Sequence, residues 1–390
     1  MTLVIIAALV LATAALLLLA LELRRKNMQL WLPAYMRRSE RPAHEGPTHI
    51  LFCFVDHFEP RWANADYESE VRRVDRWAQD YPRLARKHRD ADGCFPKHCF
   101  YYPEEEYRKE HLDKIEALCR EGFGEIEIHL HHHNDTEAGL REKLSRFTRE
   151  LRDTHGALST WPGSDKLAWG FVHGNWALDN SEPDGSNCGI NNELIILDDE
   201  GCYADFTLPS APSATQTAKI NSIYYAKDDP NQPKSHNQGR DVSIGGKSWG
   251  DLMIIQGPLM LNWKNRKWGL LPRIENSDIR SSSPPDSKRV DLWVKAGIHV
   301  KGRPEWVFVK IHTHGTQDND MDMLLGDPVD AMFSTLETKY NDGEKHVLHY
   351  VSTREMYNIV KAAEAGKKGD PNNFRDFILK PPPNRATGAK

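Results

Sequence analysis

An uncharged apolar segment near the N-terminus is the feature that most constrains this chain. Residues 3–21 carry no charged side chain, and Thr13 is the single polar residue among them. As a helix rising about 1.5 Å per residue, this segment nearly crosses the hydrocarbon core of a bilayer, which is about 30 Å thick. We therefore expect residues 1–23 to form a single-pass anchor in contact with the lipid bilayer. The segment lacks the basic start of a signal peptide and is longer than a typical signal-peptide apolar core, which favours an uncleaved anchor.

Basic residues follow this segment but do not precede it. They lie within residues 24–47, whose charges and two prolines, Pro33 and Pro42, are typical of a linker. Positively charged flanks usually stay on the cytoplasmic side of a membrane. We therefore expect the protein in the cell membrane with its body on the cytoplasmic side. The basic residues are Arg24, Arg25, Lys26, Arg37, Arg38 and Arg41.

The composition of the 390-residue chain indicates one folded body rather than a nucleic-acid-binding or disulfide-rich protein. Lysine and arginine total 51 against 56 for aspartate and glutamate, which gives a net charge of -5. No long basic run interrupts the body, so we expect no nucleic-acid partner. The six cysteines include no Cys-x-x-Cys pair. They are expected to be reduced, structural thiols.

Predicted strands and helices alternate along most of residues 48–365. This order is typical of an α/β fold with parallel strands joined by helices. Residues 210–298 are rich in Gly, Pro, Asn and Ser and interrupt the pattern, so we expect an insertion over one face. Residues 366–390 are predicted to be a mobile tail. Strands are expected at 49–55, 125–130, 168–172, 202–206, 305–311 and 346–351, and helices at 104–121, 135–155, 192–199, 327–339 and 353–365.

Histidines gather at the ends of these predicted strands. Eight of the eighteen histidines stand at or just after such an end. The carboxyl ends of parallel strands meet at one edge of the sheet, where active sites of α/β folds lie. Distant histidines can therefore share one pocket. The eight are His57, His129, His131, His132, His133, His173, His312 and His314.

Two of the segments suit a metal ion. Asp56 and His57 end the first strand and could hold a metal or act as a base, whereas an aspartate that caps the next turn is the structural alternative. Alternation along a strand would put His129, His131 and His133 on one side. Imidazole is a preferred ligand of zinc-like metals, so this second segment favours a metal site over a solvated loop.

The last histidine pair suits proton transfer. His312 and His314 end the strand predicted at 305–311, and one of them could serve as a general acid. A histidine with satisfied hydrogen bonds at a strand end is the structural alternative. The coincidence of position across three strands favours the functional interpretation.

Taken in order, these segments resemble the polysaccharide deacetylase superfamily, of the carbohydrate esterase family four type. That family has a strand ending in Asp-Asp, a Glu-Ile-x-x-His-x-x-x-His segment, an aromatic loop with an arginine, and a late strand ending in His. The matching segments here are Asp56-His57, residues 125–129 (Glu-Ile-Glu-Ile-His) with His133, residues 171–176 (Phe-Val-His-Gly-Asn-Trp), and Ile311-His312 or His314. The similarity spans about residues 48–350, and the second motif is its most specific part.

The resemblance implies a fold, a reaction and a cofactor. The fold would be a (β/α) barrel, for which a distorted seven-stranded form is one option. The reaction would be hydrolysis of an N-acyl group on a carbohydrate, with water activated by a divalent metal ion, expected to be zinc. For a body on the cytoplasmic side, a lipid-linked or nucleotide-linked sugar is the expected substrate, and for a body outside it, a growing polysaccharide.

The resemblance also implies roles for particular residues. The metal ligands would be His57, His129 and His133, and Asp56 would be the base. His312 or His314 would be the acid. The substrate would lie against His173, Asn175 and Trp176.

Two departures from the family pattern leave alternatives open. His57 stands where the family has a second aspartate, so Asp56 could instead bind the metal, with the base elsewhere. His173 stands where the family has an arginine. One alternative is a membrane-tethered carbohydrate-binding protein without turnover. Another is a different barrel metal hydrolase, in which His129 and His131 form a His-x-His pair and the substrate is a cyclic amide or a phosphate ester.

Overall fold

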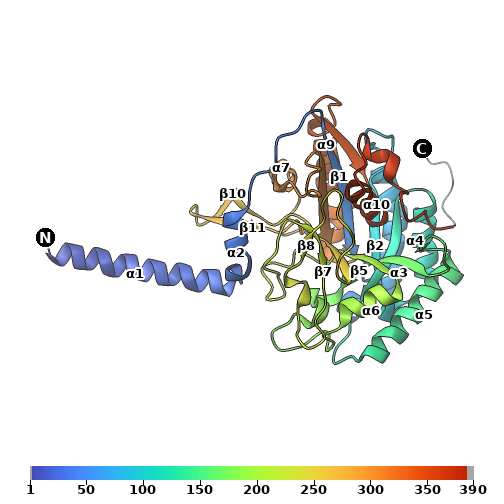
Figure 1. Cartoon of the computed structure of the whole chain (residues 1–390), viewed down its shortest axis with the longest axis horizontal. Helices are drawn as coiled ribbons and strands as arrows, with labels where there is room; N and C mark the ends of the chain where they lie inside the picture. The colour runs from blue at the N-terminus through green and yellow to red at the C-terminus, as the bar shows by residue number, and fades with distance from the viewer. Residues whose placement is uncertain (1, 384–390) are drawn as a thin grey trace.

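One large, mostly parallel sheet forms the centre of the molecule, and helices pack around it (Figure 1). The computed structural model describes residues 2–383. Parallel pairing between successive strands confirms the α/β prediction, and the strands and helices predicted from the sequence are present. The strands of this sheet are β1 (Thr48–His57), β2 (His98–Pro103), β3 (Gly124–Leu130), β4 (Ser159–Thr160), β5 (Leu167–His173), β6 (Cys202–Asp205), β7 (Ile223–Ala226), β8 (Arg240–Asp241), β9 (Leu252–Ile255), β12 (Trp306–Thr313) and β13 (His346–Tyr350).

The strand order is β12-β1-β2-β3-β5-β6-β9-β7-β8, with β13 beside the first half of β1 and β2 beside the second half. Within residues 2–383 no strand pairing joins β12 to β8, so the predicted closed barrel is not formed by hydrogen-bonded strands. The sheet nevertheless curves. The Lys310 ammonium on β12 donates to the carbonyl oxygens of Phe206 and Leu208, just after β6, each at 2.7 Å.

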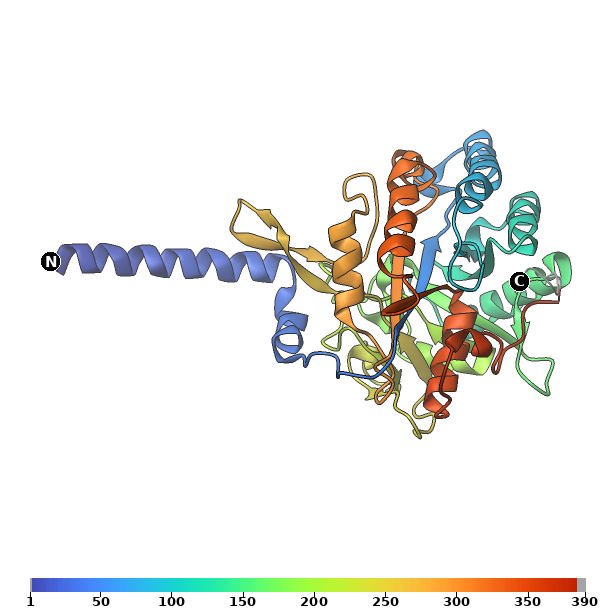
Figure 2. The same cartoon turned by 90° about the horizontal axis from the view of Figure 1, so that it is seen from above.

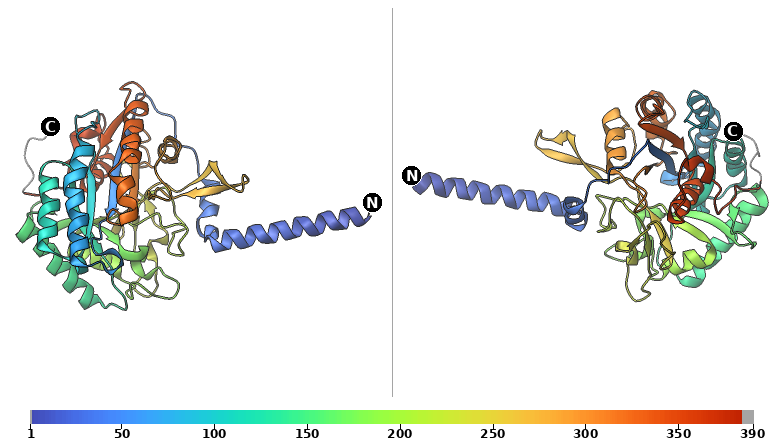
Figure 3. Two further views of the ribbon diagram at one scale, coloured as in Figure 1. Left: turned by 180° about the vertical axis from the view of Figure 1, so that it is seen from behind. Right: turned by 45° about the horizontal axis from the view of Figure 1, so that its top comes forward.

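The two faces of the sheet have different covers, because side chains alternate along each strand. On β1, Ile50, Phe52 and Phe54 pack against the surrounding helices, and we call this the helix-covered face. Leu51 and Val55 point to the opposite side, which we call the inner face. Figure 3 shows α3, α4 and α9 as a layer over the helix-covered face. The helices are α1 (Thr2–Arg25), α2 (Met28–Arg37), α3 (Tyr67–Ala85), α4 (Lys109–Arg120), α5 (Glu137–His155), α6 (Glu193–Glu200), α7 (Ser287–Ala296), α8 (Asp318–Leu324), α9 (Asp327–Lys339) and α10 (Thr353–Glu364).

Helix α10 lies against the inner face, on the opposite side of the sheet from α3 (Figure 2). Ser352 caps its start with a side-chain hydrogen bond from the Glu355 amide. Arg354 then pairs with Glu125 of β3 at 2.9 Å, with both side chains buried. This helix covers the beginnings of the strands, so the inner face near their carboxyl ends remains available for a site.

Helix α1 projects from the body (Figure 1). From Val4 to Arg25 it is long and apolar enough to cross a membrane, with a mean hydropathy of 3.0, and a signal sequence would share these properties. The predicted linker is not an unstructured connector: it contains α2, whose Trp31 and Tyr35 are buried against the 259–261 segment. Two aromatic rings on one face of a short helix are enough to dock it, which a count of charges and prolines missed.

The predicted insertion and tail also differ from expectation. Residues 210–298 do not only lie over one face, because β7, β8 and β9 extend the main sheet and α7 packs beside β10. A separate hairpin is formed by β10 (Met260–Lys267) and β11 (Leu271–Glu275). Residues 366–383 pack on the body rather than forming a mobile tail: Leu379 is fully buried and Arg375 bonds to Asp92 at 2.9 Å. The rest of that predicted tail, residues 384–390, lies outside the described residues.

All six cysteines are free, as predicted. A cavity of about 820 Å³ lies between the end of α1, α2 and the β10–β11 hairpin. Its lining is largely apolar and includes none of the strand-end histidines. Among the described residues, no histidine or cysteine lines this cavity, whereas the strand ends gather both.

Candidate functional site

Five candidate ligands from three strand ends meet on the inner face. We call His57, Glu59, His129, His131 and His314 the inner cluster. They form two sets that share Glu59, one with His57 and His314 and the other with His129 and His131. Within each set the candidate donor atoms all lie within 4.8 Å of one another. His57 ends β1 and Glu59 follows it, His129 lies near the end of β3 and His131 follows that strand, and His314 follows β12, so the parallel strands bring the predicted ligands His57 and His129 to one edge.

Two histidines of this cluster direct their Nε2 atoms at one carboxylate oxygen. The Nε2 atoms of His129 and His131 lie 3.1 Å and 3.3 Å from Glu59 Oε1. His129 donates its Nδ1 hydrogen to the Val172 carbonyl oxygen at 2.6 Å, and His131 donates its Nδ1 hydrogen to Glu105 at 2.5 Å. In its neutral form each ring therefore turns an Nε2 lone pair toward Glu59. A carboxylate oxygen and two imidazole nitrogens that meet in this way need positive charge between them, which either a proton on a ring or a metal ion supplies, and the Val172 and Glu105 contacts orient the rings as partners of metal ligands do.

The other half of the cluster is a stacked pair of imidazoles. The His57 and His314 rings lie 4.6 Å apart at an interplanar angle of 23°, and the His57 and His129 rings lie 4.8 Å apart. His312 is farther away, with its ring 6.4 Å from that of His57, and it is almost fully buried. Of the two predicted acids, His314 is therefore the one in contact with the cluster.

The electrostatics of the cluster favour positive charge at its centre. Burial raises the pKa of Glu59, but hydrogen bonds from His129 and His131 outweigh it, so this carboxyl is held well below its ordinary pKa. Burial lowers the pKa of His131, but Glu105 and Glu59 outweigh it and raise the pKa to about 10. Burial, with the neighbouring histidines, lowers the pKa of His57 and of His129. The two carboxylates thus attract positive charge, which a proton on His131 supplies or a metal ion that displaces this proton would supply, and the His57 and His129 imidazoles are kept neutral and available as ligands.

Asp56 does not belong to this cluster, which corrects its predicted role as base. It precedes His57 on the strand and so points to the helix-covered face, where it is fully buried. His98 donates to Asp56 Oδ2 at 2.7 Å, and the Gly315 amide donates to Oδ1 at 2.5 Å. Asp56 therefore joins β1 to β2 and to the segment after β12.

His133 does not belong to the cluster either, although it was a predicted metal ligand. Strand β3 ends at Leu130, so the alternation that would place His133 beside His129 does not continue. His133 is exposed, and its Nδ1 accepts a hydrogen bond from the Asn187 amide at 3.0 Å. His131 occupies the place expected for it.

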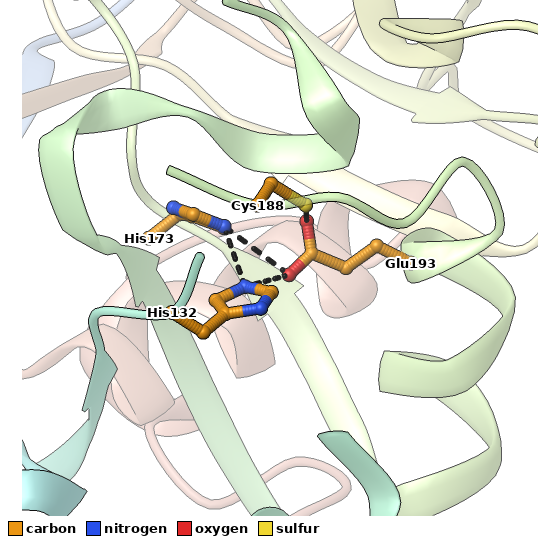
Figure 4. A group of neighbouring side chains, drawn as sticks. All are labelled: His132, His173, Cys188 and Glu193. Atoms are coloured by element: carbon orange, nitrogen blue, oxygen red, sulfur yellow. Dashed lines mark hydrogen bonds and ion pairs between the residues drawn. The ribbon is translucent and has the colours of Figure 1, made fainter. Parts of the chain in front are cut away.

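Of the three predicted substrate-binding residues, only Trp176 lies beside the cluster. Its ring is 5.7 Å from that of His314. Asn175 is exposed just before it, and His173 is fully buried on the helix-covered face, against His132 and Glu193 (Figure 4). Side chains two residues apart on a strand lie on the same face, so His173 lies on the helix-covered face with Phe171 of β5. Substrate therefore cannot reach it.

The cluster reaches the surface at one side. The His131 side chain is 31% exposed, whereas His57, Glu59 and His129 are buried. Trp62 lies at this rim, with its ring 6.2 Å from His314 and 43% of its surface exposed. Close packing continues behind the rim, since a Cβ at Gly174 would lie 2.3 Å from His131 Cδ2. A ligand can therefore reach the cluster at the rim formed by His131, His314, Trp62 and Trp176.

Sequence reasoning missed Glu59, Glu105 and Trp62, and it considered His131 as a ligand only beside His133 and in the alternative with a His-x-His pair. Glu59 had a usable signal, because it lies two residues beyond His57 and so on the same side of an extended chain. Trp62 and Glu105 had none, since each lies in a short 3-10 segment. Compared with known proteins, the chain matches no protein-family model, and no curated protein matches it. The resemblance to deacetylases therefore rests on the motifs themselves.

Proposed function

We propose that the protein is a membrane-anchored, metal-dependent hydrolase that removes an N-acyl group from a carbohydrate. The observation that carries this proposal is the convergence of four histidines and Glu59 at the carboxyl ends of β1, β3 and β12. This is the edge of an α/β sheet where active sites occur. The curvature of the sheet, with the Lys310 bridge across it, supports the likeness to an open form of the deacetylase barrel.

The inner cluster suits a divalent ion such as zinc. Imidazole nitrogen and carboxylate oxygen are ordinary zinc ligands, and the partly exposed side leaves a position for substrate. When bound, the ion would supply a Lewis acid for the acyl carbonyl and a hydrolytic nucleophile at neutral pH. Glu59, His129 and His131 would hold it, with His57 completing the set.

The remaining residues of the rim bind substrate and move a proton. His314 stacks on His57 and is partly exposed, so it can donate a proton to the departing amine. Trp62 and Trp176 both lie beside His314 and can stack on a sugar ring. Glu105 holds the Nδ1 hydrogen of His131 and so fixes the direction of its Nε2.

A second candidate is supported by one contact pattern. His129 and His131 both reach Glu59, so the His-x-His pair of a different metal hydrolase is assembled in space. Such an enzyme would act on a cyclic amide or a phosphate ester. The inner cluster would bind the metal in both cases, and the substrate distinguishes them.

The test is a substrate panel with the full-length protein in detergent. We expect acetate release from N-acetylglucosamine oligomers or from a nucleotide-linked N-acetyl sugar, lost on chelation and restored by zinc. Hydrolysis of phosphate esters or cyclic amides alone would favour the second candidate. Metal retention with sugar binding but no hydrolysis of any compound would identify a binding protein.

Trp62→Ala is expected to weaken substrate binding while metal binding is unchanged. Loss of a stacking ring should raise KM about 5-fold with little change in kcat, because stacking contributes about 1 kcal/mol in both the substrate and the transition-state complex. Steady-state kinetics and metal analysis check this. Trp249→Ala, which alters an exposed tryptophan elsewhere, is the control. An unchanged KM in Trp62→Ala would remove the rim from the binding site.

We also propose that α1 spans the cell membrane with the body on the cytoplasmic side. The β10–β11 hairpin extends toward the same side of the body as α1 (Figure 2), and Lys267 on it pairs with Glu22 at 3.0 Å. Its Trp268 and Leu270 are 72% and 75% exposed, and tryptophan is favoured at the membrane interface. These contacts support a body seated against the bilayer.

The orientation is checked with reporters fused after Lys390. A fluorescent protein that folds only in the cytoplasm is expected to fluoresce, and an alkaline phosphatase fusion at the same place is expected to be inactive, because the basic residues after α1 retain the body inside. An active phosphatase fusion would place the body outside and make a growing polysaccharide the expected substrate.

A further inference from the structure

A second group of candidate ligands lies on the helix-covered face, behind the inner cluster. We call His132, His173, Cys188 and Glu193 the outer cluster (Figure 4). His132 lies in the loop after β3, His173 ends β5, Cys188 lies in the loop that follows, and Glu193 begins α6. His131 and His132 are neighbours in the chain, yet one points into each cluster.

The four side chains point toward one another and shield one another from solvent. His132 Nε2 lies 2.9 Å from His173 Nε2, and Glu193 Oε1 lies 3.1 Å and 3.3 Å from these two atoms. Cys188 Sγ lies 3.7 Å from Glu193 Oε2. One ligand atom from each of the four residues falls within 4.8 Å of the others, and all four residues are buried. A group this enclosed has no access for a substrate.

The hydrogen bonds of the two rings leave an excess of acceptors at the centre. His173 donates its Nδ1 hydrogen to the Gly174 carbonyl at 2.6 Å, so its Nε2 carries a lone pair when the ring is neutral. His132 Nδ1 lies 3.1 Å from Asp135 Oδ2 without the geometry of a hydrogen bond, and the carboxylate charge favours a hydrogen on this nitrogen. With the hydrogens on Nδ1, two Nε2 lone pairs and a carboxylate oxygen face each other, and positive charge between them, from a proton or a metal ion, relieves the repulsion.

Another close histidine pair needs no such cation. His49 Nδ1 lies 2.9 Å from His349 Nε2, and His349 Nδ1 lies 2.7 Å from Asp92. Here His349 donates to Asp92, and His49 donates its Nδ1 hydrogen to the free Nε2 of His349. One tautomer of each ring satisfies every contact. The outer cluster differs because its two rings meet through the same atom, Nε2.

We propose that the outer cluster binds one structural zinc ion through His132 Nε2, His173 Nε2, Cys188 Sγ and an oxygen of Glu193. Two imidazoles, a thiolate and a carboxylate make a closed four-ligand set of the kind that zinc takes in structural sites. Zinc–ligand bonds of about 2.0–2.3 Å place the donors of a tetrahedral site about 3.3–3.8 Å apart. The separations between the donor atoms are near this range, so small rotations of the side chains admit the ion.

The cysteine distinguishes a metal from a proton. A proton shared by His132, His173 and Glu193 would also relieve the repulsion, but it would leave Cys188 only as a weak thiol donor to Glu193 and to the Ile190 carbonyl oxygen. Cys188 instead completes a set of nitrogen, sulfur and oxygen ligands, and soft sulfur ligands favour zinc over calcium or magnesium.

Such an ion would fasten the segment between β5 and α6. Residues 174–192 have few regular elements, and they carry Trp176 to the rim of the inner cluster. The proposed ligands lie at both ends of this segment, at His173 and at Cys188 and Glu193. The ion would therefore position Trp176 without touching substrate, and this inference does not depend on the reaction proposed above.

Cobalt substitution of the full-length protein tests the proposal, because only the outer cluster contains a cysteine. Cobalt bound to a thiolate gives a near-ultraviolet charge-transfer absorption that histidine and carboxylate ligands do not give. We expect this absorption in the wild type and in His129→Ala, which alters the inner cluster. In Cys188→Ser we expect this absorption to be lost. We also expect elemental analysis of the zinc-loaded variant to find one zinc ion fewer per chain than in the wild type. Cys94→Ser, which alters a cysteine outside both clusters, should retain both signals.

A second measurement covers the case in which Cys188→Ser does not fold. Alkylation of wild-type Cys188, mapped by mass spectrometry, is expected to increase at least 10-fold after chelation, because the fully buried thiol loses its ligand bond and its cover. Absence of the charge-transfer absorption in the wild type, or unchanged alkylation after chelation, would overturn the proposal and leave a shared proton at the cluster. Loss of the inner metal alone would leave both readouts unchanged, so the two metal sites are tested separately.

Discussion

His131→Ala is expected to lose both the inner metal and hydrolysis, whereas His133→Ala is expected to retain both. The two histidines are two residues apart, but only His131 directs a nitrogen at Glu59, at 3.3 Å. His133 is exposed and bonds to the Asn187 amide instead. Removing a ligand should lower metal affinity and kcat/KM by more than the roughly 10–100-fold that loss of a residue hydrogen-bonded to a ligand costs.

The measurement is metal affinity by competition with a chelator, together with kcat/KM for each variant. Glu105→Gln serves as an intermediate case, because it keeps all ligands and weakens only the support of His131 Nδ1. We expect it to lose about 10–100-fold in affinity. Metal loss in His133→Ala with retention in His131→Ala would reverse the assignment and restore the ligand spacing expected from the family motif.

Asp56→Ala is expected to destabilise the fold without removing the metal. Its carboxylate is fully buried between the His98 ring and the Gly315 amide, at 2.7 Å and 2.5 Å. Removing one partner of a buried, hydrogen-bonded pair costs about 3–5 kcal/mol, because the other groups remain buried and unpaired. The site is also tightly packed, since a Cβ at Gly315 would lie 2.0 Å from Asp56 Oδ2. The free energy of unfolding, measured by denaturant titration, should fall by that amount.

Asp56→Asn is the conservative companion of this variant. It keeps the volume and an acceptor for the Gly315 amide, so it should cost less stability than the alanine variant. Metal content per folded chain should equal that of the wild type in both variants. A fully stable, metal-loaded Asp56→Asn protein without hydrolytic activity would instead show that Asp56 acts on the substrate.

The order of strands and helices could be predicted because it depends on local patterns. The apolar run at 49–55 became β1, and the helical spacing at 327–339 became α9. Two of the elements that were missed, β2 and α2, are explained by their surroundings. Strand β2 contains His98 and Pro103, which are unusual in a buried strand. His98 can be buried there because Asp56, on a distant part of the chain, accepts its hydrogen bond. Helix α2 is held by its contacts with the insertion.

The candidate site could be predicted in place but not in composition. Histidines after three strands pointed to one edge of the sheet, and His57 and His129 do meet there. His133 and His173 were assigned to the same site because a sequence pattern does not record where a strand stops or which way a loop turns. Because β3 ends at Leu130, His132 and His133 do not lie beside His129. His173 lies on the face of β5 that the helices cover, so it is buried.

The linear order of residues was sufficient for the properties that act over a few neighbours: an apolar helix near the N-terminus, alternating strands and helices, and imidazoles at strand ends. Packing in three dimensions decided the rest. Whether a side chain faces the inner or the helix-covered side depends on where each strand ends, and a ligand set depends on which distant side chains fall within a few ångströms. For that reason Glu59, Glu105 and Cys188 were recognised only in the folded chain.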